Sequence, residues 1–396
     1  MTMQLNTVDE MDVRGKRVLL RADFNVPLDE GRITDDNRVR ATLPTIRALL
    51  DKQATLVVMS HLGRPKGVDD RYRLEPVAVR LEELLGREVR YRRSAGPASP
   101  EEQSFVHEAP AGSVTLVENL RFDARETKNE PSLARELATY GDLYVDDAFG
   151  AVHRAHASTV GVARLLPSAA GLLLQREVEV LSRLLEQPAK PFKVILGGAK
   201  VSDKIGVIDN LLEVVDEIFV GGAMAYTFLA AQGGSVGASL VEEDHLATAR
   251  DVLEVARTRN TRLHLPQDSL CAKEIREGAP AEIFPSDDIP DGYMGLDIGP
   301  SAIAAYQEAL ADAKTIFWNG PLGVFETPPF DSGTRIIAET VASLPGAFTV
   351  VGGGDSVSAI RQTGMASKID HISTGGGASL EFLEGKTLPG LEVLQQ

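Results

Sequence analysis

Residues 192–200, FKVILGGAK, carry the pattern that decides the fold: a short apolar run that ends in a glycine pair and is followed by a helical stretch. Similar runs recur at 17–25, 55–65, 114–122, 142–154, 217–224, 262–268, 315–321, 348–355 and 371–377. Short β-branched runs that alternate with longer helical segments are typical of βα units and a parallel sheet. The sequence therefore predicts an α/β protein.

The strands of the two halves end in different residues. Most first-half runs lead into Arg, Asn, His or Asp, whereas most second-half runs lead into glycine pairs or triplets. A helical pattern at 169–186 separates them, and 396 residues are too many for one ordinary domain core. We predict two Rossmann-like domains, 1–170 and 188–379, each a parallel β-sheet flanked by helices. An interdomain helix at 171–187 would join them, with a cleft between the domains.

The charge and cysteine content exclude several classes of partner. The chain has 57 acidic and 41 basic side chains, a net charge of −16, which disfavours nucleic acids and anionic membranes as partners. Cys271 is the only cysteine, so no intramolecular disulfide can form, as is usual in a reducing compartment. Because the N-terminus also lacks the pattern of a signal peptide, we expect a cytoplasmic protein. We also expect a monomer.

Polar side chains follow the first-half strands. Arg21, Asp23 and Asn25 occupy alternate positions in RADFN, and alternate positions on a strand share a face. They could converge on one ligand, although an edge strand with a solvated polar face remains an alternative. In HLGRP, His61 and Arg64 lie on a Gly-Pro turn directly after a strand.

Five arginines from separate segments of the first half suggest an anion site: Arg21, Arg38, Arg64, Arg121 and Arg154. Guanidinium groups bind phosphate and carboxylate through charge-assisted hydrogen bonds of about 1.5–3 kcal/mol each. A small, multiply charged acid fits this set. His153 and His156, three residues apart, could form half of a metal site, but a structural role is the better interpretation.

The second half presents glycine-rich turns. In GGAKVSDKI, Lys200 and Lys204 follow a glycine pair beside a helix start, which favours phosphate binding. GGGDS (352–356) adds Asp355, a candidate Mg²⁺ ligand or a helix cap, and STGGGAS (373–379) is a third such turn. Three turns of this kind suggest a nucleotide polyphosphate, although neither GxGxxG nor GxxxxGK[ST] is present.

The segment WNGPLGVFE (318–326) surrounds a rigid Gly-Pro turn. Asn319 and Glu326 could bind ribose hydroxyls. The alternative is a surface turn with Trp318 and Phe325 in the core.

Together these segments resemble the signatures of the phosphoglycerate kinase family. The matching segments are RADFNVP, SHLGRP, ENLRF, DAFGAVHRAHAS, GGAKVSDKI, GGAMAYTFL, WNGPLGVFE, VGGGD and STGGGASLEFLEGKTLPG, in that family's order from about Val13 to Gly390. The resemblance implies reversible phosphoryl transfer in glycolysis and gluconeogenesis, from 1,3-bisphosphoglycerate to Mg-ADP, giving 3-phosphoglycerate and ATP. It also implies Mg²⁺ as cofactor and a C-terminal tail, 380–396, that joins the first domain.

The resemblance assigns roles residue by residue. The substrate set would be Arg21, Asp23, Asn25, Arg38, His61, Leu62, Gly63, Arg64, Arg121 and Arg154. The nucleotide set would be Gly198, Lys200, Lys204, Gly222, Asn319, Glu326, Gly353, Gly354, Asp355 and Ser356, with Asp355 as the metal ligand. The transferred group would be stabilised by Arg38, Lys200, Gly375 and Gly376.

The chemistry of a carboxyl acceptor explains why no catalytic base is evident. A carboxylate nucleophile is already ionised at neutral pH, so catalysis must come from positioning and from neutralising charge on the transferred group. Two alternatives remain open. A non-catalytic scaffold would bind ADP without forming ATP, and an NAD-linked dehydrogenase would have this architecture but lacks its glycine fingerprint.

Overall fold

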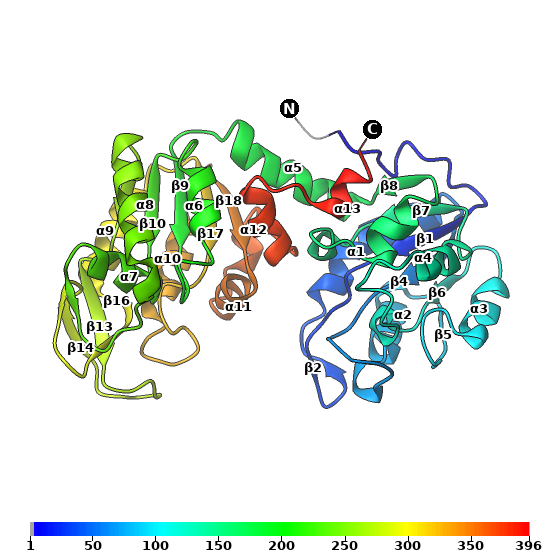
Figure 1. Cartoon of the computed structure of the whole chain (residues 1–396), viewed down its shortest axis with the longest axis horizontal. Helices are drawn as coiled ribbons and strands as arrows, with labels where there is room; N and C mark the ends of the chain where they lie inside the picture. The colour runs from blue at the N-terminus through cyan, green and yellow to red at the C-terminus, as the bar shows by residue number, and fades with distance from the viewer. Residues whose placement is uncertain (1–3, 396) are drawn as a thin grey trace. The chain divides into compact units, whose positions relative to one another are not determined.

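The computed structural model describes residues 4–395 of the chain and divides it into two compact units. The first unit extends to Glu179 and includes the segment from Thr387 onward, and the second is Val180–Lys386. Helix α5 (Leu172–Glu186) carries the chain from one unit into the other (Figure 1). The two units are called the first and the second unit below.

The first unit is built on a parallel sheet. Its strand order is β5 (Val89–Tyr91), β6 (Val114–Leu116), β4 (Thr55–Met59), β1 (Arg17–Arg21), β7 (Leu143–Asp146) and β8 (Ser168–Ala170), and every pairing is parallel. The carboxyl ends of all these strands therefore lie at one edge. Four of the strands were predicted, whereas β5 and β8 were not.

Hydrophobic burial explains why these segments form a sheet. Val18 and Leu20 of β1 and Val58 of β4 are fully buried and share a core with Ile46 and Leu49 of α1 (Asn37–Asp51). Parallel strands are covered on both faces, so they appear in sequence as nearly continuous apolar runs. The unit also contains α2 (Glu75–Leu85), α3 (Pro100–His107), α4 (Pro131–Ala138), α13 (Pro389–Glu392) and the hairpin β2 (Leu28–Asp29) with β3 (Arg32–Ile33).

The second unit has the same kind of sheet, which confirms the predicted α/β fold class. The strand order is β12 (Arg262–His264), β10 (Glu217–Val220), β9 (Phe192–Leu196), β17 (Thr315–Asn319), β18 (Phe348–Gly352) and β19 (His371–Ile372), again with parallel pairing throughout. The flanking helices are α6 (Ile205–Leu211), α7 (Met224–Ala231), α8 (Leu246–Thr258), α9 (Pro300–Leu310), α10 (Ser332–Val341), α11 (Gly354–Gln362) and α12 (Gly377–Leu383).

The second unit also contains short strands that the sequence pattern did not predict. Strand β13 (Asp268–Ala272) pairs antiparallel with β14 (Glu282–Pro285) and β16 (Met294–Ile298). Strands β11 (Ser235–Val236) and β15 (Asp288–Ile289) form a separate parallel pair.

Helix α5, Leu172–Glu186, closely matches the predicted interdomain helix at 171–187. The first two residues of the helical pattern at 169–186 belong to β8 (Ser168–Ala170). The cap comes from a distant residue: the Asp147 Oδ1 atom accepts the backbone N–H groups of Leu173 (2.9 Å) and Leu174 (3.3 Å). Burial raises the pKa of Asp147 to about 8, so the cap acts through the hydrogen bonds that its side-chain oxygen accepts and not through a full negative charge.

The C-terminal segment returns to the first unit later than expected. The change of unit falls at Thr387, not at 380. Helix α12 stays in the second unit because it packs on α6, where the Asn210 Nδ2 atom donates to the Leu383 carbonyl at 2.7 Å. Beyond it, the Gly390 N–H donates to the Val152 carbonyl at 2.8 Å and the Asn6 N–H to the Leu394 carbonyl at 3.0 Å. The described ends of the chain accordingly lie near each other (Figure 1).

Candidate active site

The substrate set predicted in the first unit gathers at the carboxyl edge of its sheet. The loops that carry it follow the adjacent strands β6, β4, β1 and β7. Arg38, in the first turn of α1, joins this edge through an ion pair: its Nη1 atom lies 3.0 Å from the Asp23 Oδ2 atom. The same Nη1 atom donates to the Asn25 carbonyl at 3.1 Å. The structure thus brings Asp23, Asn25 and Arg38 together.

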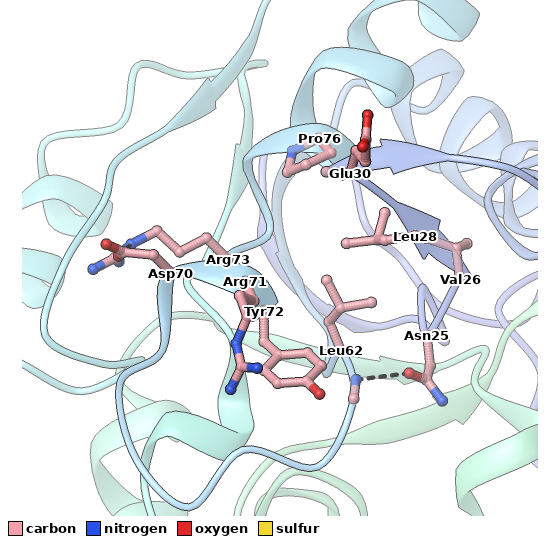
Figure 2. A pocket seen from close by; sticks show the side chains of 12 residues that line it. Asn25, Val26, Leu28, Glu30, Leu62, Asp70, Arg71, Tyr72, Arg73 and Pro76 are labelled. Atoms are coloured by element: carbon pink, nitrogen blue, oxygen red, sulfur yellow. Dashed lines mark hydrogen bonds and ion pairs between the residues drawn. The ribbon is translucent and has the colours of Figure 1, made fainter.

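The His61–Arg64 loop is held by its backbone. The Gly63 N–H donates to the Asn25 Oδ1 atom at 2.8 Å, the contact drawn in Figure 2, and the Gly63 carbonyl accepts from the Arg121 Nη1 atom at 3.1 Å. Gly63 has a φ of +63°, and a Cβ there would lie 2.3 Å from the Tyr72 ring. Only glycine fits this position, so Leu62 and Gly63 shape the loop that displays His61.

A pocket of about 640 Å³ lies beside this loop (Figure 2). Its walls are largely apolar: Val26, Leu28, Leu62, Tyr72 and Pro76. Arg71 and Arg73 also line it, but they form ion pairs of 2.7 Å with Asp69 and Glu118. A multiply charged acid would gain little from such walls. The better anion site is formed by Arg21, Arg38, Arg64, Arg121 and Arg154, which we call the arginine cluster.

Asn119 is a site residue that the sequence reasoning missed. It is fully buried, and its Oδ1 atom accepts the N–H groups of Leu62 (3.2 Å) and Arg121 (3.0 Å). Its Nδ2 atom donates to the carbonyls of Leu62 and Tyr72, both at 2.8 Å. The ENLRF motif contains Asn119, but its partners up to 57 residues away are not visible in the sequence.

Burial and charge set the protonation states of this cluster. Burial alone would raise the pKa of Asp23, but the charge of Arg38, with that of Arg21, outweighs it, and the pKa of Asp23 is lowered. Burial lowers the pKa of His61 well below its usual value; the charge of Asp23 opposes this shift, and the neighbouring arginines add to it. At neutral pH Asp23 is therefore a carboxylate and His61 is a neutral imidazole.

The arginines differ in their access to solvent. Arg64 and Arg154 are exposed, and Arg38 and Arg121 are half-buried. Arg21 is fully buried, with an exposed fraction of 0%. The exposed and half-buried arginines can reach an incoming anion, whereas Arg21 lies behind the His61 side chain that it contacts.

His156 makes the stability of the first unit depend on pH. Burial lowers the pKa of His156 to about 4, and the charges of Arg21 and Arg121 act in the same direction. The Glu126 Oε1 atom lies 3.8 Å from the His156 Nδ1 atom, but burial and the neighbouring positive charges determine the direction of the shift. An unfolded histidine titrates near 6.5, so His156 supports folding above pH 6.5 and this support is lost as the pH falls toward 4.

The His156→Gln variant should therefore lose part of the parent's fall in unfolding free energy between pH 6.5 and 4.5. Urea denaturation of both proteins at several pH values measures this difference. The exposed His107 offers a control, because His107→Gln should keep the parent's slope. Equal slopes for parent and His156→Gln would show that His156 does not titrate in this range on unfolding.

In the second unit, three loops meet at the carboxyl edge of the sheet. A Cβ on Gly222 would lie 2.6 Å from the backbone N and O atoms of Gly198, and one on Gly197 would lie 2.0 Å from the Pro321 carbonyl oxygen. The Gly198 N–H donates to the Pro321 carbonyl at 2.9 Å, and the Gly222 N–H donates to the Leu322 carbonyl at 2.8 Å. The loops after β9, β10 and β17 can approach so closely only because glycine occupies these positions.

Lys204, Asn319 and Ser356 fix the arrangement of this edge. The Lys204 Nζ atom donates to the Asn319 Oδ1 atom, and the Asn319 Nδ2 atom donates to the Gly352 carbonyl at 2.8 Å. The Ser356 Oγ atom accepts the Gly320 N–H. Asn319 is buried, with an exposed fraction of 1%, so in the structure its side chain bonds to protein atoms.

The aromatic residues of the 318–326 segment belong to the core. Trp318 is fully buried, its Nε1 atom donates to the Gly320 carbonyl at 2.7 Å, and Phe325 is 7% exposed. Glu326 is exposed. The interpretation of Trp318 and Phe325 as core residues is thus confirmed.

The other residues predicted to bind the nucleotide or the transferred group lie between a strand and the helix that follows it. Gly353 (φ +93°) precedes α11 and Gly376 (φ +52°) precedes α12, with Gly375 buried just before it. Lys200 is exposed in the loop after β9, and Gly354 begins α11. The Lys200 ammonium group and the backbone N–H groups of the first helical turn are therefore placed where they could bind a phosphate.

Asp355 could serve as the one protein ligand of a Mg²⁺ ion whose other ligands are phosphate oxygens and water. The residue is exposed in the first turn of α11, and its carboxylate makes no hydrogen bond or ion pair to any residue in 4–395. Within the same residues, no three His, Cys, Asp or Glu side chains gather as a metal cluster. Mg²⁺ commonly uses one or two carboxylates together with phosphate oxygens and water, which matches a single carboxylate beside a phosphate site.

No helix in the described part of the chain has the length and apolar character needed to cross a membrane.

Comparison with known proteins identifies the family. A family model described as phosphoglycerate kinase matches residues 8–386. The chain is 53% identical over 394 residues to the phosphoglycerate kinase of Thermus thermophilus, covering 99% of this chain and 100% of the relative. It is 54% identical over 395 residues to that of Rubrobacter xylanophilus, covering 100% and 99%. The solved structure of phosphoglycerate kinase from Coxiella burnetii superposes with a TM-score of 0.88 at 40% identity, covering 98% of each chain. The chain therefore belongs to the phosphoglycerate kinase family.

Proposed function

We propose that the chain catalyses the reversible transfer of a phosphoryl group from 1,3-bisphosphoglycerate to Mg-ADP, giving 3-phosphoglycerate and ATP. The observation that carries the proposal is the family match over residues 8–386, which includes both predicted ligand sets. The arginine cluster of the first unit and the glycine-rich loops of the second supply chemistry suited to a small acid and to a nucleotide, respectively.

The first unit would hold the triose acid. The guanidinium groups of Arg38, Arg64, Arg121 and Arg154 offer planar pairs of donors to phosphate and carboxylate. Asp23 and Asn25 hold Arg38 in place before the ligand arrives, because its Nη1 atom already contacts both residues. This preorganisation reduces the ordering cost of binding.

The second unit would hold the nucleotide phosphates. Lys200, Lys204 and the N–H groups that begin α11 would bind the phosphate oxygens, with Asp355 as the protein ligand of Mg²⁺. When bound, Mg²⁺ neutralises negative charge on the nucleotide phosphates. The lysines and backbone donors orient the phosphate chain for transfer.

The transfer step needs no proton movement on the acceptor. A carboxylate oxygen of 3-phosphoglycerate forms a bond to the γ-phosphorus of ATP while the bond to the β,γ-bridging oxygen breaks, and the reverse step regenerates ATP. Arg38, Lys200 and the backbone N–H groups of Gly375 and Gly376 would stabilise the charge of the group in transfer. We propose direct in-line transfer within a closed site from which water is excluded, so the two bound ligands must meet when the reaction takes place.

A coupled assay of ATP formation from 1,3-bisphosphoglycerate and ADP tests the function. The proposal predicts steady ATP production that depends on both substrates. Binding of ADP without ATP formation would identify the scaffold alternative and reject catalysis. Binding of a nicotinamide dinucleotide without turnover would favour the dehydrogenase alternative.

The Asp355→Asn variant should need at least about tenfold more Mg²⁺ for half-maximal activity, because an amide keeps the size of the side chain but loses the charge that attracts the ion. Titration of activity with Mg²⁺ at saturating substrates measures this shift. Asp209, exposed on α6, provides a control, since Asp209→Asn should match the parent. An unchanged Mg²⁺ requirement in Asp355→Asn would remove Asp355 from the metal site.

We also propose a cytoplasmic monomer that binds neither nucleic acid nor membrane. Cys271 is a buried free thiol whose pKa is raised to about 12 by burial, which fits a reducing compartment. Analytical ultracentrifugation tests the monomeric state, and a dimer mass at working concentration would contradict it.

A further inference from the structure

We propose that Glu126, Ser158 and Arg21 form a buried hydrogen-bond chain that positions His61 and fixes its tautomer, so that the His61 Nε2–H group donates to the anionic ligand. These three would be positioning residues that act through His61. The identity of the ligand rests on the function proposed above, but the chain of contacts does not.

The chain begins at a buried carboxylate. Glu126 is 1% exposed and Ser158 is fully buried. The Ser158 hydroxyl donates to the Glu126 Oε1 atom at 2.6 Å, and the Ser158 N–H donates to the Glu126 Oε2 atom at 3.0 Å. Both side-chain oxygens of Glu126 act as acceptors. Burial raises the pKa of Glu126, and the charge of Arg21 with the two Ser158 hydrogen bonds opposes this shift. Because its only hydrogen is committed to Glu126, the Ser158 hydroxyl can offer other groups only lone pairs.

Arg21 donates a hydrogen bond to the Ser158 oxygen, and this contact helps to orient its guanidinium group. Its Nε–H group donates to the Ser158 Oγ atom at 2.9 Å, and its Nη1 atom donates to the Ala22 carbonyl. Its Nη2 atom lies 3.0 Å from the His61 Nδ1 atom. Since the guanidinium group is planar and rigid, contacts at all three nitrogens fix both its plane and its direction.

The last contact decides the tautomer of His61. Arginine has only donors, so the His61 Nδ1 atom must accept the hydrogen bond. His61 is 7% exposed, and burial lowers its pKa well below the usual value, so the ring carries one proton. That proton must be on the Nε2 atom, which has no hydrogen-bond partner within residues 4–395. The loop therefore presents His61 as a donor of fixed direction close to Arg38 and Arg121.

The hydrogen-bond chain acts on His61 through the geometry of Arg21 and not through its charge. Glu126 compensates this charge, and Arg21 has no exposed surface with which to meet an anion. Lysine in its place would keep the charge, but a single ammonium group lacks the rigid fork that joins Ser158 to His61. The Arg21→Lys variant thus separates positioning from electrostatics.

The first test is the tautomer of His61 in the ligand-free, ¹⁵N-labelled full chain. Nitrogen–proton correlation spectra, with the His61 signals assigned by the His61→Gln variant, should show a protonated Nε2 and an unprotonated Nδ1 in the parent. In Arg21→Lys and Ser158→Ala the spectra should show a mixture of tautomers. A parent His61 with its proton on Nδ1 would overturn the proposal, and this measurement needs no variant to remain folded and no enzymatic activity.

The second test is kinetic. In Arg21→Lys and Ser158→Ala, the KM for 3-phosphoglycerate should rise by about tenfold to a hundredfold, the loss expected for a hydrogen bond to a charged group, while the KM for Mg-ATP stays within about twofold. Ser168→Ala is the matched control and should match the parent. Among residues 4–395, the Ser168 hydroxyl bonds only to the carbonyls of Ala163 and Leu166. Unchanged KM values for 3-phosphoglycerate would overturn the positioning role.

The two tests also separate this inference from the proposed function. A parent protein without any phosphoryl transfer would reject the function and the identity of the ligand, whereas the His61 spectrum would still establish or reject the chain of contacts. A general loss of stability would raise both KM values together, so a rise confined to 3-phosphoglycerate is specific to the proposal.

Discussion

Replacing Arg38 with alanine should lower the turnover number by about 10³- to 10⁵-fold, the range that an arginine contributes at a phosphoryl-transfer transition state. Within residues 4–395, Arg38 donates hydrogen bonds to Asp23 and the Asn25 carbonyl through its Nη1 atom alone. The Nη2 and Nε donors therefore stay available to the group in transfer. Steady-state rates at saturating 3-phosphoglycerate and Mg-ATP measure the effect.

Arg40 offers a matched control on the same helix. Its Nε atom forms an ion pair of 2.9 Å with Asp36, and its side chain is 51% exposed. Arg40→Ala should therefore retain the parent's turnover within about twofold. A turnover of Arg38→Ala within tenfold of the parent would show that Arg38 does not stabilise the transferred group.

The second large effect is expected for Lys200→Ala, with a fall in turnover of about 10³-fold or more. Lys200 is exposed in the glycine-rich loop after β9, so its ammonium group can follow the phosphoryl group as negative charge develops. Because the effect belongs to the transition state, turnover should fall much further than nucleotide affinity. Measuring both the turnover number and the dissociation constant for ADP separates the two.

Lys273, exposed and placed 4.9 Å from the centre of the Tyr293 ring, provides the control for the loss of one positive charge. Lys273→Ala should leave turnover unchanged. If Lys200→Ala instead weakened ADP binding by the whole loss in activity, Lys200 would be a binding residue and not part of the catalytic set.

Much of the fold was predictable because parallel strands are buried on both faces. In β1, β4, β9 and β17 most residues are apolar, so each strand is visible in the sequence without knowledge of its neighbours. The strands that escaped prediction lack this signal. β5 is only Val89–Tyr91 and contains Arg90, and β8 is Ser168–Ala170, made of small residues.

Features set by distant contacts were not predictable from local patterns. The N-terminal cap of α5 comes from the Asp147 side chain, which accepts the N–H of Leu173 from 26 positions earlier in the sequence. The point where the C-terminal segment returns to the first unit depends on the packing of α12 against α6. The local sequence around these residues does not indicate either contact.

The candidate site divides in the same way. Arg38, His61 and Arg121 were predicted as site residues because polar and basic residues that follow buried runs are conspicuous in the sequence. Asn119, Glu126 and Ser158 were missed because each acts on residues far away in the sequence. The Ser158 Oγ atom contacts an arginine 137 positions earlier, and nothing in AHASTVG indicates that partner.

A crystal structure of the chain with 3-phosphoglycerate, Mg²⁺ and a non-hydrolysable ATP analogue tests the central claim most directly. The account predicts the acid within hydrogen-bond distance of Arg38, His61 and Arg121, and the nucleotide phosphates at Lys204 and the start of α11. A carboxylate oxygen of the acid should lie in line with the terminal phosphorus. Both ligands bound to the same unit, or an acid bound away from the arginine cluster, would contradict it.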